Sequence, residues 1–374
     1  MRIVHTSDWH LGRVFCQMSL LEEQRHVLEQ FIGIVREAKA DAVVIAGDLY
    51  DRAVPPAEAV SLCDDVLCEL ALKLHVPVIV IAGNHDSPQR IGFGSKLMAA
   101  GNVHLAGEIT KKPMCVTLGD SYGPVTLVAL PYSDPPFVKA CFDDDSVRDH
   151  DSAMKCCLAH LPKGGRSVLV AHAFVVGGSV SESERPLTVG GAGTVNAEHF
   201  AGFSYAALGH LHRPQAINGG HVQYAGSLLK YSFDESSHTK SVNIVEIDKN
   251  GAATVERVEL KPKRDVRCIS GKFEDLLKSP LGNRDDFLQV TLEDDAVIFE
   301  AKQRLREVYP NVLELRLASM MKERELSGDR IDHTKADPLQ LFGRFFKEVK
   351  DQEMTEAQVQ AFIKVAAAVN KEEQ

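Results

Sequence analysis

Eight side chains that can bind metal ions or move protons stand at the ends of five short apolar runs in this sequence. They are carboxylates, imidazoles and one amide, and no cysteine is among them. Such a mixture suits divalent ions such as manganese, iron or zinc. Even seven of these groups are more than one ion needs, so the set predicts two ions that share a bridging carboxylate. The eight residues are Asp8, His10, Asp48, Asn84, His85, His172, His210 and His212.

The sequence Gly83-Asn84-His85-Asp86 is the centre of this arrangement. It follows residues 78–82, an unbroken apolar run that is typical of a buried parallel strand. The carboxyl ends of such strands are where α/β proteins place their chemistry. Burying an amide, an imidazole and a carboxylate in a row costs free energy unless each group has a hydrogen-bonding, ionic or metal partner. The other strand ends can supply those partners.

Four further strands are predicted to position the remaining side chains. Asp8 and His10 are two residues apart, so they should point to the same side of an extended chain, and the same holds for His210 and His212. A glycine before Asp48 allows a tight backbone at that strand end. The four strands are expected at residues 2–6, 41–46, 167–171 and 205–208.

Between these strands, the spacing of apolar residues predicts helices over 20–38, 57–73 and 89–100. A run of Lys, Pro and Arg at 261–264 indicates a boundary that closes a first domain of residues 1–260. A small α/β unit is expected at 261–320. Its strands are predicted at 265–270, 287–292 and 312–317, and its helices at 272–278 and 296–308.

Residues 321–374 are expected to hold a polar linker and two amphipathic helices. Short helices of this kind need a surface on which to bury their apolar stripes. That surface could belong to a partner protein or to the chain's own core. The two stripes consist of Leu339, Leu341, Phe342, Phe345, Phe346 and Val349, and of Val359, Phe362, Ile363, Val365, Ala366 and Val369.

Charge and composition limit the choice of function and compartment. The net charge of −10 argues mildly against a surface that binds nucleic acid everywhere, although local basic patches stay possible. No apolar stretch is long enough to cross a bilayer, and no signal peptide is expected. Eight cysteines without a CxxC pair favour reduced thiols in the cytoplasm over disulfides or a zinc site.

Taken together, these strand ends resemble the signature of the calcineurin-like metallophosphoesterases. The resemblance implies an α/β fold: a β-sandwich flanked by helices, here with a small α/β capping domain and C-terminal helices. It also implies which residues share each ion. Asp8, His10, Asp48 and His212 would hold one ion, and Asp48, Asn84, His172 and His210 the other, with Asp48 as the bridge.

The same resemblance leaves His85 without a metal ion and assigns it to the leaving oxygen of the substrate. An imidazole in that role needs a carboxylate that holds its tautomer and favours its charged form. By analogy with the family, Asp51 is expected to be that carboxylate. Asp86 is the alternative, and it could equally be a structural residue of the turn.

Longer motifs narrow the resemblance to the nuclease subunits of bacterial SbcCD complexes. This family implies manganese-dependent exonuclease action on double-stranded DNA and endonuclease action on single-stranded DNA, in DNA repair, recombination and replication. It implies an SbcC-type coiled-coil ATPase as partner, which the C-terminal helices would dock, and a homodimer formed through helices 57–73 and 89–100. The motifs are residues 5–12, 172–174, 181–186, 207–215 and 224–233.

Two other functions compete with the nuclease. One is a phosphatase or phosphodiesterase that acts on small molecules or proteins through the same two ions. The other is a binding scaffold that has lost catalysis, which the complete ligand set argues against. Basic residues that could contact DNA are Arg13, Arg52, Arg90, Lys261, Lys263 and Arg264.

Overall fold

The structure is a computed structural model of the chain. It describes residues 1–161, 164–187, 193–217 and 220–319, together with 339, 342–343, 346–347, 350 and 352–363. The chain divides into two compact units, one of residues 1–229 with 238–262 and the other of residues 230–237 with 263–374. Much of the expected helix pair, including Leu341, Phe345 and Val349, lies outside the described residues.

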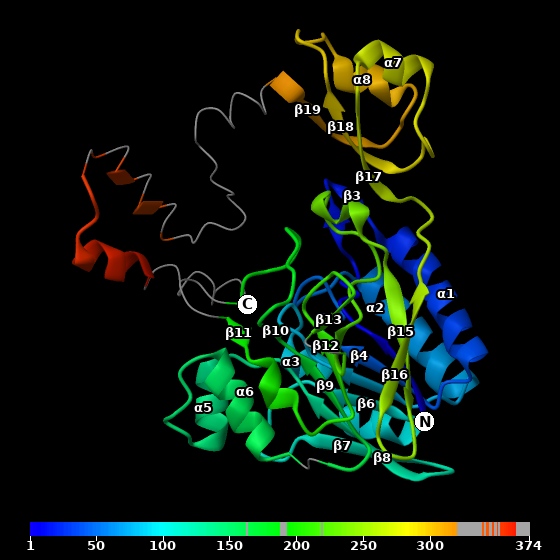
Figure 1. The fold of residues 1–374 in the computed structure, drawn as a ribbon, viewed down its shortest axis with the longest axis vertical. Helices are drawn as coiled ribbons and strands as arrows, with labels where there is room; N and C mark the ends of the chain where they lie inside the picture. The colour runs from blue at the N-terminus through cyan, green and yellow to red at the C-terminus, as the bar shows by residue number, and fades with distance from the viewer. Residues whose placement is uncertain are drawn as a thin grey trace. The chain divides into compact units, whose positions relative to one another are not determined.

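The first unit is built around two six-stranded sheets (Figure 1). Most of their strands are parallel, and each sheet has antiparallel strands at one or both edges. The first sheet consists of β1 (Arg2–Thr6), β4 (Ala42–Ala46), β5 (Val78–Ile81), β6 (Val103–Ala106), β15 (Ser241–Ile247) and β16 (Ala253–Glu259). The second consists of β7 (Met114–Asp120), β8 (Gly123–Leu130), β9 (Ser167–His172), β12 (Tyr205–Gly209), β13 (Gln215–Ile217) and β14 (Val222–Tyr224).

The two sheets pack face to face. One apolar cluster contains Ile3, Val44 and Ile79 from the first sheet together with Val168 and Val170 from the second. Alternate residues of the second sheet, such as Leu169 and Ala171, belong to another cluster on its outer face. Burial on both faces explains why these strands are unbroken apolar runs. The predicted β-sandwich is confirmed.

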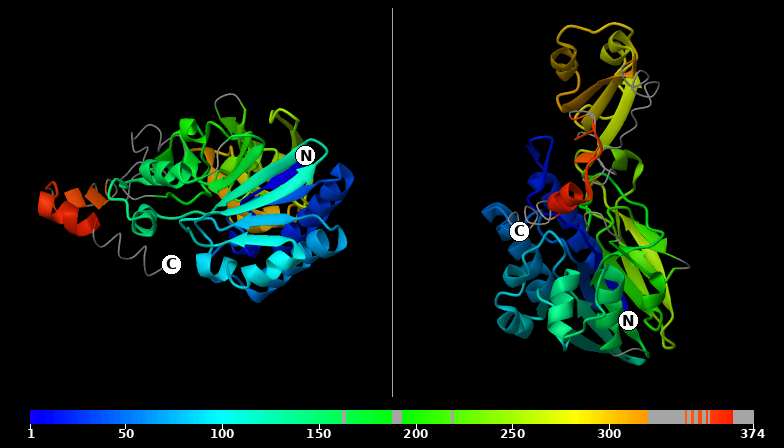
Figure 2. Two further views of the ribbon diagram at one scale, coloured as in Figure 1. Left: turned by 90° about the horizontal axis from the view of Figure 1, so that it is seen from below. Right: turned by 90° about the vertical axis from the view of Figure 1, so that its left-hand side faces the viewer.

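Helices cover the outer faces of this sandwich. The pair α1 (Leu21–Ala38) and α2 (Ala57–Cys68) lies apart from the pair α5 (Pro135–Phe142) and α6 (His150–Ala159) (Figures 1 and 2). The acidic stretch before α6 ends in a capping box, in which Asp149 and Ser152 satisfy each other's main-chain N–H groups.

Two predicted helices have different limits in the structure. The helix expected at 89–100 is broken into α3 (Pro88–Ile91), α4 (Ser95–Met98) and a 3₁₀ turn at Ala99–Gly101. Gly94 causes the break because it adopts a φ of 70°, which an α-helix does not allow. The predicted helix over 57–73 is present, but its last turn is a π-helix at Glu69–Lys73.

The second unit contains a three-stranded parallel sheet with two helices. Its elements are β17 (Val266–Gly271), α7 (Phe273–Lys278), β18 (Phe287–Leu292), α8 (Ala301–Arg306) and β19 (Val312–Leu317). The helix predicted at 296–308 is therefore shorter than expected. Phe273, Leu305 and Tyr309 are fully or almost fully buried in the core of this unit. Nearer the C-terminus, the rings of Phe342 and Phe362 stack with centroids 4.5 Å apart.

Residues 356–363 are helical, and several short elements are also present. They are β2 (Val14–Phe15), β3 (Met18–Ser19), β10 (Phe174–Val175), β11 (Thr194–Val195) and 3₁₀ turns at Ala197–Phe200 and Asp234–Ser237. None of the helices in the described part of the chain combines the length and the hydropathy that a membrane span needs.

Candidate metal centre

The parallel strands β1, β4 and β5 end at the same edge of the first sheet, and β9 and β12 end together in the second. The polar residues that follow these strands therefore meet at one place. The loops after β1 and β4 are joined directly, because the N–H groups of Asp8 and His10 donate to the carbonyl oxygens of Gly47 and Asp48 at 3.0 Å each. All seven predicted metal ligands lie in this region.

The prediction of an extended backbone is wrong at Asp8, His10 and His210. Asp8, His10 and Asp48 have φ values of 51°, 45° and 50°, and His210 has 105°. Non-glycine residues adopt such φ values only at a cost in conformational free energy. Residues strained in this way are often found at functional sites. The chain turns sharply at these four positions, so two-residue spacing in an extended chain is not what brings the side chains together.

One group of predicted ligands consists of Asp8, His10 and His212. One ligand atom from each lies within 4.8 Å of the other two. The Nε2 atoms of His10 and His212 are 3.0 Å apart. This group matches three of the four residues expected to hold the first ion.

The second group consists of Asn84, His172 and His210. The Oδ1 atom of Asn84 lies 2.8 Å from Nε2 of His172 and 3.1 Å from Nδ1 of His210. The carboxylate of Asp48 lies between the two groups, since its Oδ2 atom is 3.7 Å from Nε2 of His10 and 3.5 Å from Nε2 of His172. Asp48 therefore occupies the position that a bridging ligand needs.

The site is buried, and its electrostatics favour a cation. Asp8 and Asp48 are almost completely inaccessible to solvent. Burial raises the pKa of Asp8 well above its usual value, and the neighbouring Asp48 raises it further. Burial also raises the pKa of Asp48, but the adjacent imidazoles of His172 and His85 outweigh this and lower it overall. Burying two carboxylates costs free energy when positive charge nearby does not balance them. Bound divalent cations would supply that charge.

The histidines are suited to binding metal in their neutral form. Burial lowers the pKa of both His10 and His210 well below the usual value for histidine, and neighbouring imidazoles add to this effect. Burial also lowers the pKa of His172, although Asp48 opposes it. Neutral imidazoles are the ligand form, and metal does not have to displace a proton from them. The donor set thus fits two divalent ions.

Asp51 and Asp86 make different contacts in the structure. His85 Nδ1 lies 2.9 Å from the main-chain carbonyl oxygen of Asp51, whereas the Asp51 carboxylate accepts a hydrogen bond from Arg13 at 2.8 Å. The Asp86 carboxylate accepts from the N–H groups of Gly83, Leu49 and Tyr50 and ties the two loops together. A carbonyl oxygen thus fixes the His85 tautomer, with Nδ1 protonated and Nε2 facing away.

Several residues that support the ligands were not predicted. Gln24 is fully buried, donates to the carbonyl oxygens of Trp9 and His10, and accepts from Gly12 N–H. It stands on the same face of α1 as the buried Val27, Leu28, Phe31 and Val35, and a glutamine within an apolar stripe is a signal that could have identified it. Ser183, Glu184 and Lys240 contact His212 from loops, where no periodicity marks them. The motif at 181–186 includes Ser183 and Glu184, but the sequence assigned no role to either of them.

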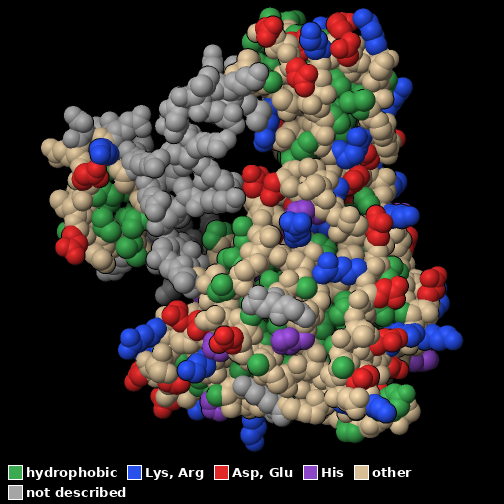
Figure 3. Space-filling view, in the orientation of Figure 1, with side chains coloured by type: hydrophobic (Ala, Val, Ile, Leu, Met, Phe, Trp, Pro, Cys, Tyr) green, Lys and Arg blue, Asp and Glu red, His purple; other side chains and the backbone are tan. Residues whose placement is uncertain are grey.

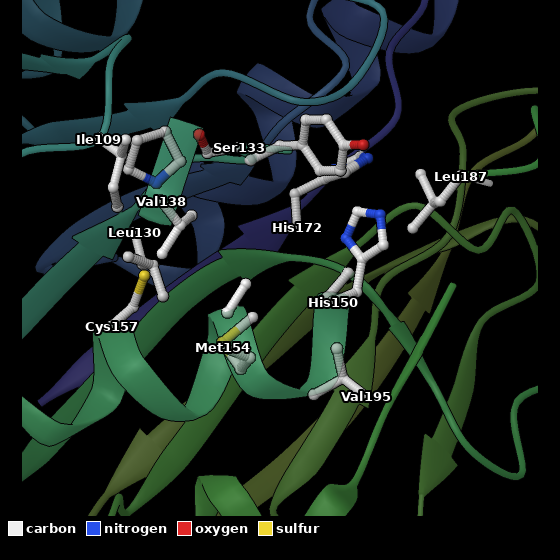
Figure 4. Close-up of a pocket in the computed structure, with 14 residues that line it drawn as sticks. Ile109, Leu130, Ser133, Val138, His150, Met154, Cys157, His172, Leu187 and Val195 are labelled. Atoms are coloured by element: carbon white, nitrogen blue, oxygen red, sulfur yellow. The ribbon is translucent and has the colours of Figure 1, made fainter. Parts of the chain in front are cut away.

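A small cavity beside His172 is too small for a nucleotide. Its volume is about 30 Å³, and most of its lining residues are apolar. Figure 4 shows His150, Ser133 and His172 around it, with Leu187 at one side. The ring of His150 stacks on Tyr132 with centroids 5.9 Å apart. A volume of this size holds a water molecule.

Gly83 packs tightly against Asp48, and this contact gives a first test of the site. Alanine at position 83 is expected to lower the free energy of unfolding by about 1–3 kcal/mol, because its Cβ would lie 2.2 Å from Oδ1 and 2.3 Å from the main-chain nitrogen of Asp48. Alanine at Gly33 in α1 is the control, since nothing lies within 4 Å of the point that its Cβ would occupy. Equal denaturation midpoints for Gly83→Ala and Gly33→Ala would contradict this packing.

Comparison with known proteins agrees with the geometry. A model of the calcineurin-like phosphoesterase family matches residues 1–214, and one described as "Type 5 capsule protein repressor C-terminal domain" matches 262–350. Two curated relatives are named as the SbcD subunit of the SbcCD nuclease. The relative from Staphylococcus saprophyticus is 32% identical and covers 100% of this chain and 99% of its own length. The one from Staphylococcus epidermidis is 31% identical, covering 96% of each.

Among solved structures, TT1561 of Thermus thermophilus aligns with a TM-score of 0.39 at 14% identity, covering 70% of this chain and 99% of its own. The matches to the family and to the curated relatives span the strand ends that bring Asp8, Asp48, Asn84 and the histidines together. The chain therefore belongs to the calcineurin-like phosphoesterase family and, within it, to the SbcD nuclease subunits.

Proposed function

We propose that this protein is the manganese-dependent nuclease subunit of an SbcCD-type complex and that it hydrolyses phosphodiester bonds in DNA. The observation that carries the proposal is the place of the Asp48 carboxylate between two groups of ligands. Exonuclease action on double strands and endonuclease action on single strands follow from the family resemblance. The relatives named as SbcCD nuclease subunits support the assignment over the full length of the chain.

The ligands divide into two sets with Asp48 in common. Asp8, His10, Asp48 and His212 would hold one manganese ion, and Asp48, Asn84, His172 and His210 the other. A bound pair of ions supplies an activated water and a clamp for the phosphoryl group. The chain's own contribution is to bury the carboxylates, to keep the imidazoles neutral and to aim their nitrogen atoms at one point.

His85 would act on the leaving oxygen. Its main-chain N–H donates to Asp48 Oδ1 at 2.8 Å, which places its ring beside the ligands without using a ring nitrogen. With Nδ1–H on the Asp51 carbonyl oxygen, Nε2 can face the substrate, and in the charged ring, which carries a proton on both nitrogens, Nε2–H would stabilise or protonate the departing group. Asp51 thereby acts as a positioning residue through its main chain in this proposal.

The remaining parts of the proposal concern partners and compartment. Residues 261–320 would be a capping domain that helps to hold DNA, and 321–374 would dock an SbcC-type ATPase. A homodimer would form through the helices between 57 and 100. All eight cysteines are free, in line with a reducing cytoplasm. On the face seen in Figure 3, acidic and basic side chains are interspersed, so DNA would be recognised locally rather than by overall charge.

An assay of two substrates tests the proposal. The purified protein with manganese is given linear duplex DNA and, separately, p-nitrophenyl phosphate esters, with and without the ATPase partner. Cleavage of DNA that stops on chelation of the metal is the expected result. Cleavage of the esters but not of DNA, even with the partner present, would favour the phosphatase. No cleavage of either would favour a binding scaffold.

A further inference from the structure

His212 is held from three sides by residues that are not among the predicted metal ligands. Ser183 Oγ lies 2.6 Å from His212 Nδ1. Glu184 Oε1 accepts the main-chain N–H of His212 at 2.6 Å. The ammonium group of Lys240 donates to its carbonyl oxygen at 2.7 Å. The ring, the N–H and the carbonyl of one ligand are thus each fixed by a separate side chain.

The Glu184 carboxylate also bonds within its own segment, residues 181–184. Glu184 Oε2 accepts the N–H of Ser181 at 2.7 Å while its Oε1 holds His212. Ser183 is 9% exposed and Lys240 is 4% exposed, so water does not compete freely for these contacts. The arrangement is a buried clamp around one residue.

By accepting a hydrogen bond from Nδ1–H, the hydroxyl of Ser183 supports the form of His212 whose Nε2 can bind a metal ion. His212 Nε2 faces His10 Nε2 at 3.0 Å, on the ligand side. A proton on Nδ1, donated to Ser183 Oγ, leaves the Nε2 lone pair for a cation. His172 reaches the same state in a different way, because its Nδ1 lies 2.9 Å from the carbonyl oxygen of Ala46 in β4. Of these two contacts, only the one at His212 can therefore be removed by changing a side chain.

We propose that Ser183, supported by Glu184, is a positioning residue that sets the affinity of the ion held by His212 and leaves the ion held by His172 almost unaffected. This inference rests on the proposed two-ion site. Partners of this kind typically contribute about 10-fold to 100-fold to metal affinity. The two ions should then respond differently to a change that is confined to the segment 181–184.

The test measures manganese binding in the full-length protein by following the free-ion signal in electron paramagnetic resonance. Ser183→Ala is expected to lower the affinity of the protein for one of its two manganese ions by about 10-fold or more. The affinity for the other ion should not change. Ser183→Thr retains a hydroxyl and should restore most of the lost affinity. Ser179→Ala is the matched control in the same loop, since Ser179 bonds to Gln215 through main-chain atoms only.

The outcomes separate this inference from the proposed function. Two ions of unchanged affinity in Ser183→Ala would overturn it, and so would equal losses in the alanine and threonine variants, which would indicate a packing role. Fewer than two ions in the unmodified protein would instead contradict the two-ion site. Thermal unfolding in the presence of a chelator checks that each variant is folded before metal is added.

Discussion

Replacing Asp48 by asparagine is expected to lower the rate of DNA hydrolysis by at least about 10³-fold and to reduce the number of bound manganese ions from two to one or none. The reason is its position, with Oδ2 3.7 Å from His10 Nε2 and 3.5 Å from His172 Nε2. Asparagine keeps the shape and can still accept the His85 N–H through Oδ1, but it lacks the charge that two cations need.

Two measurements on one preparation check this prediction: the cleavage rate at saturating manganese and the metal content after dialysis. Asp145→Asn is the matched control, because the Asp145 side chain is 97% exposed and its ion pair with Lys139 lies at the surface. A variant at Asp48 that still binds two ions tightly would contradict the bridging role. Loss of activity in both variants would point to a general effect of charge.

Replacing His85 by glutamine is expected to lower the rate of DNA hydrolysis by about 10²-fold to 10⁴-fold, while both ions stay bound. The ring of His85 packs edge-on against His10 with centroids 4.6 Å apart, but its Nδ1 is occupied by the Asp51 carbonyl oxygen. Its loss should therefore remove a proton donor for the leaving oxygen and leave the ligand set complete.

Substrates with leaving groups of different basicity make this test sharper. The deficit of His85→Gln should shrink with p-nitrophenolate as leaving group, since that anion departs without needing a proton. His26→Gln, at a partly exposed histidine of α1, is the control. Loss of a manganese ion in His85→Gln would show that His85 supports the metal and that the assigned role is wrong.

The sequence predicts most of the central architecture because the signals there are local. Residues 42–46 and 78–81 are unbroken apolar runs, and both are buried strands. A polar residue after such a run has to lie at the carboxyl edge of a sheet, which is why Asp48 and Asn84 could be placed near each other without coordinates. The helix at 20–38 is predictable for a similar reason, since its apolar stripe repeats at helical spacing.

Other features depend on contacts between distant parts of the chain, and those have no local signal. The left-handed turns at Asp8 and His10 are stabilised by hydrogen bonds to the loop after β4. The contact between Ser183 and His212 joins two loops that are 29 positions apart. The use of the Asp51 main chain rather than its carboxylate depends on where Arg13 lies, which spacing alone does not reveal.

The most direct test of the two-ion site is anomalous diffraction from crystals of the protein soaked in manganese. We predict two anomalous peaks about 3.5–4 Å apart, with one carboxylate oxygen of Asp48 bound to each ion or one oxygen shared by both. His212 should contact one peak and His172 the other. A single peak, or two peaks with Asp48 bound to neither, would contradict the two-ion site.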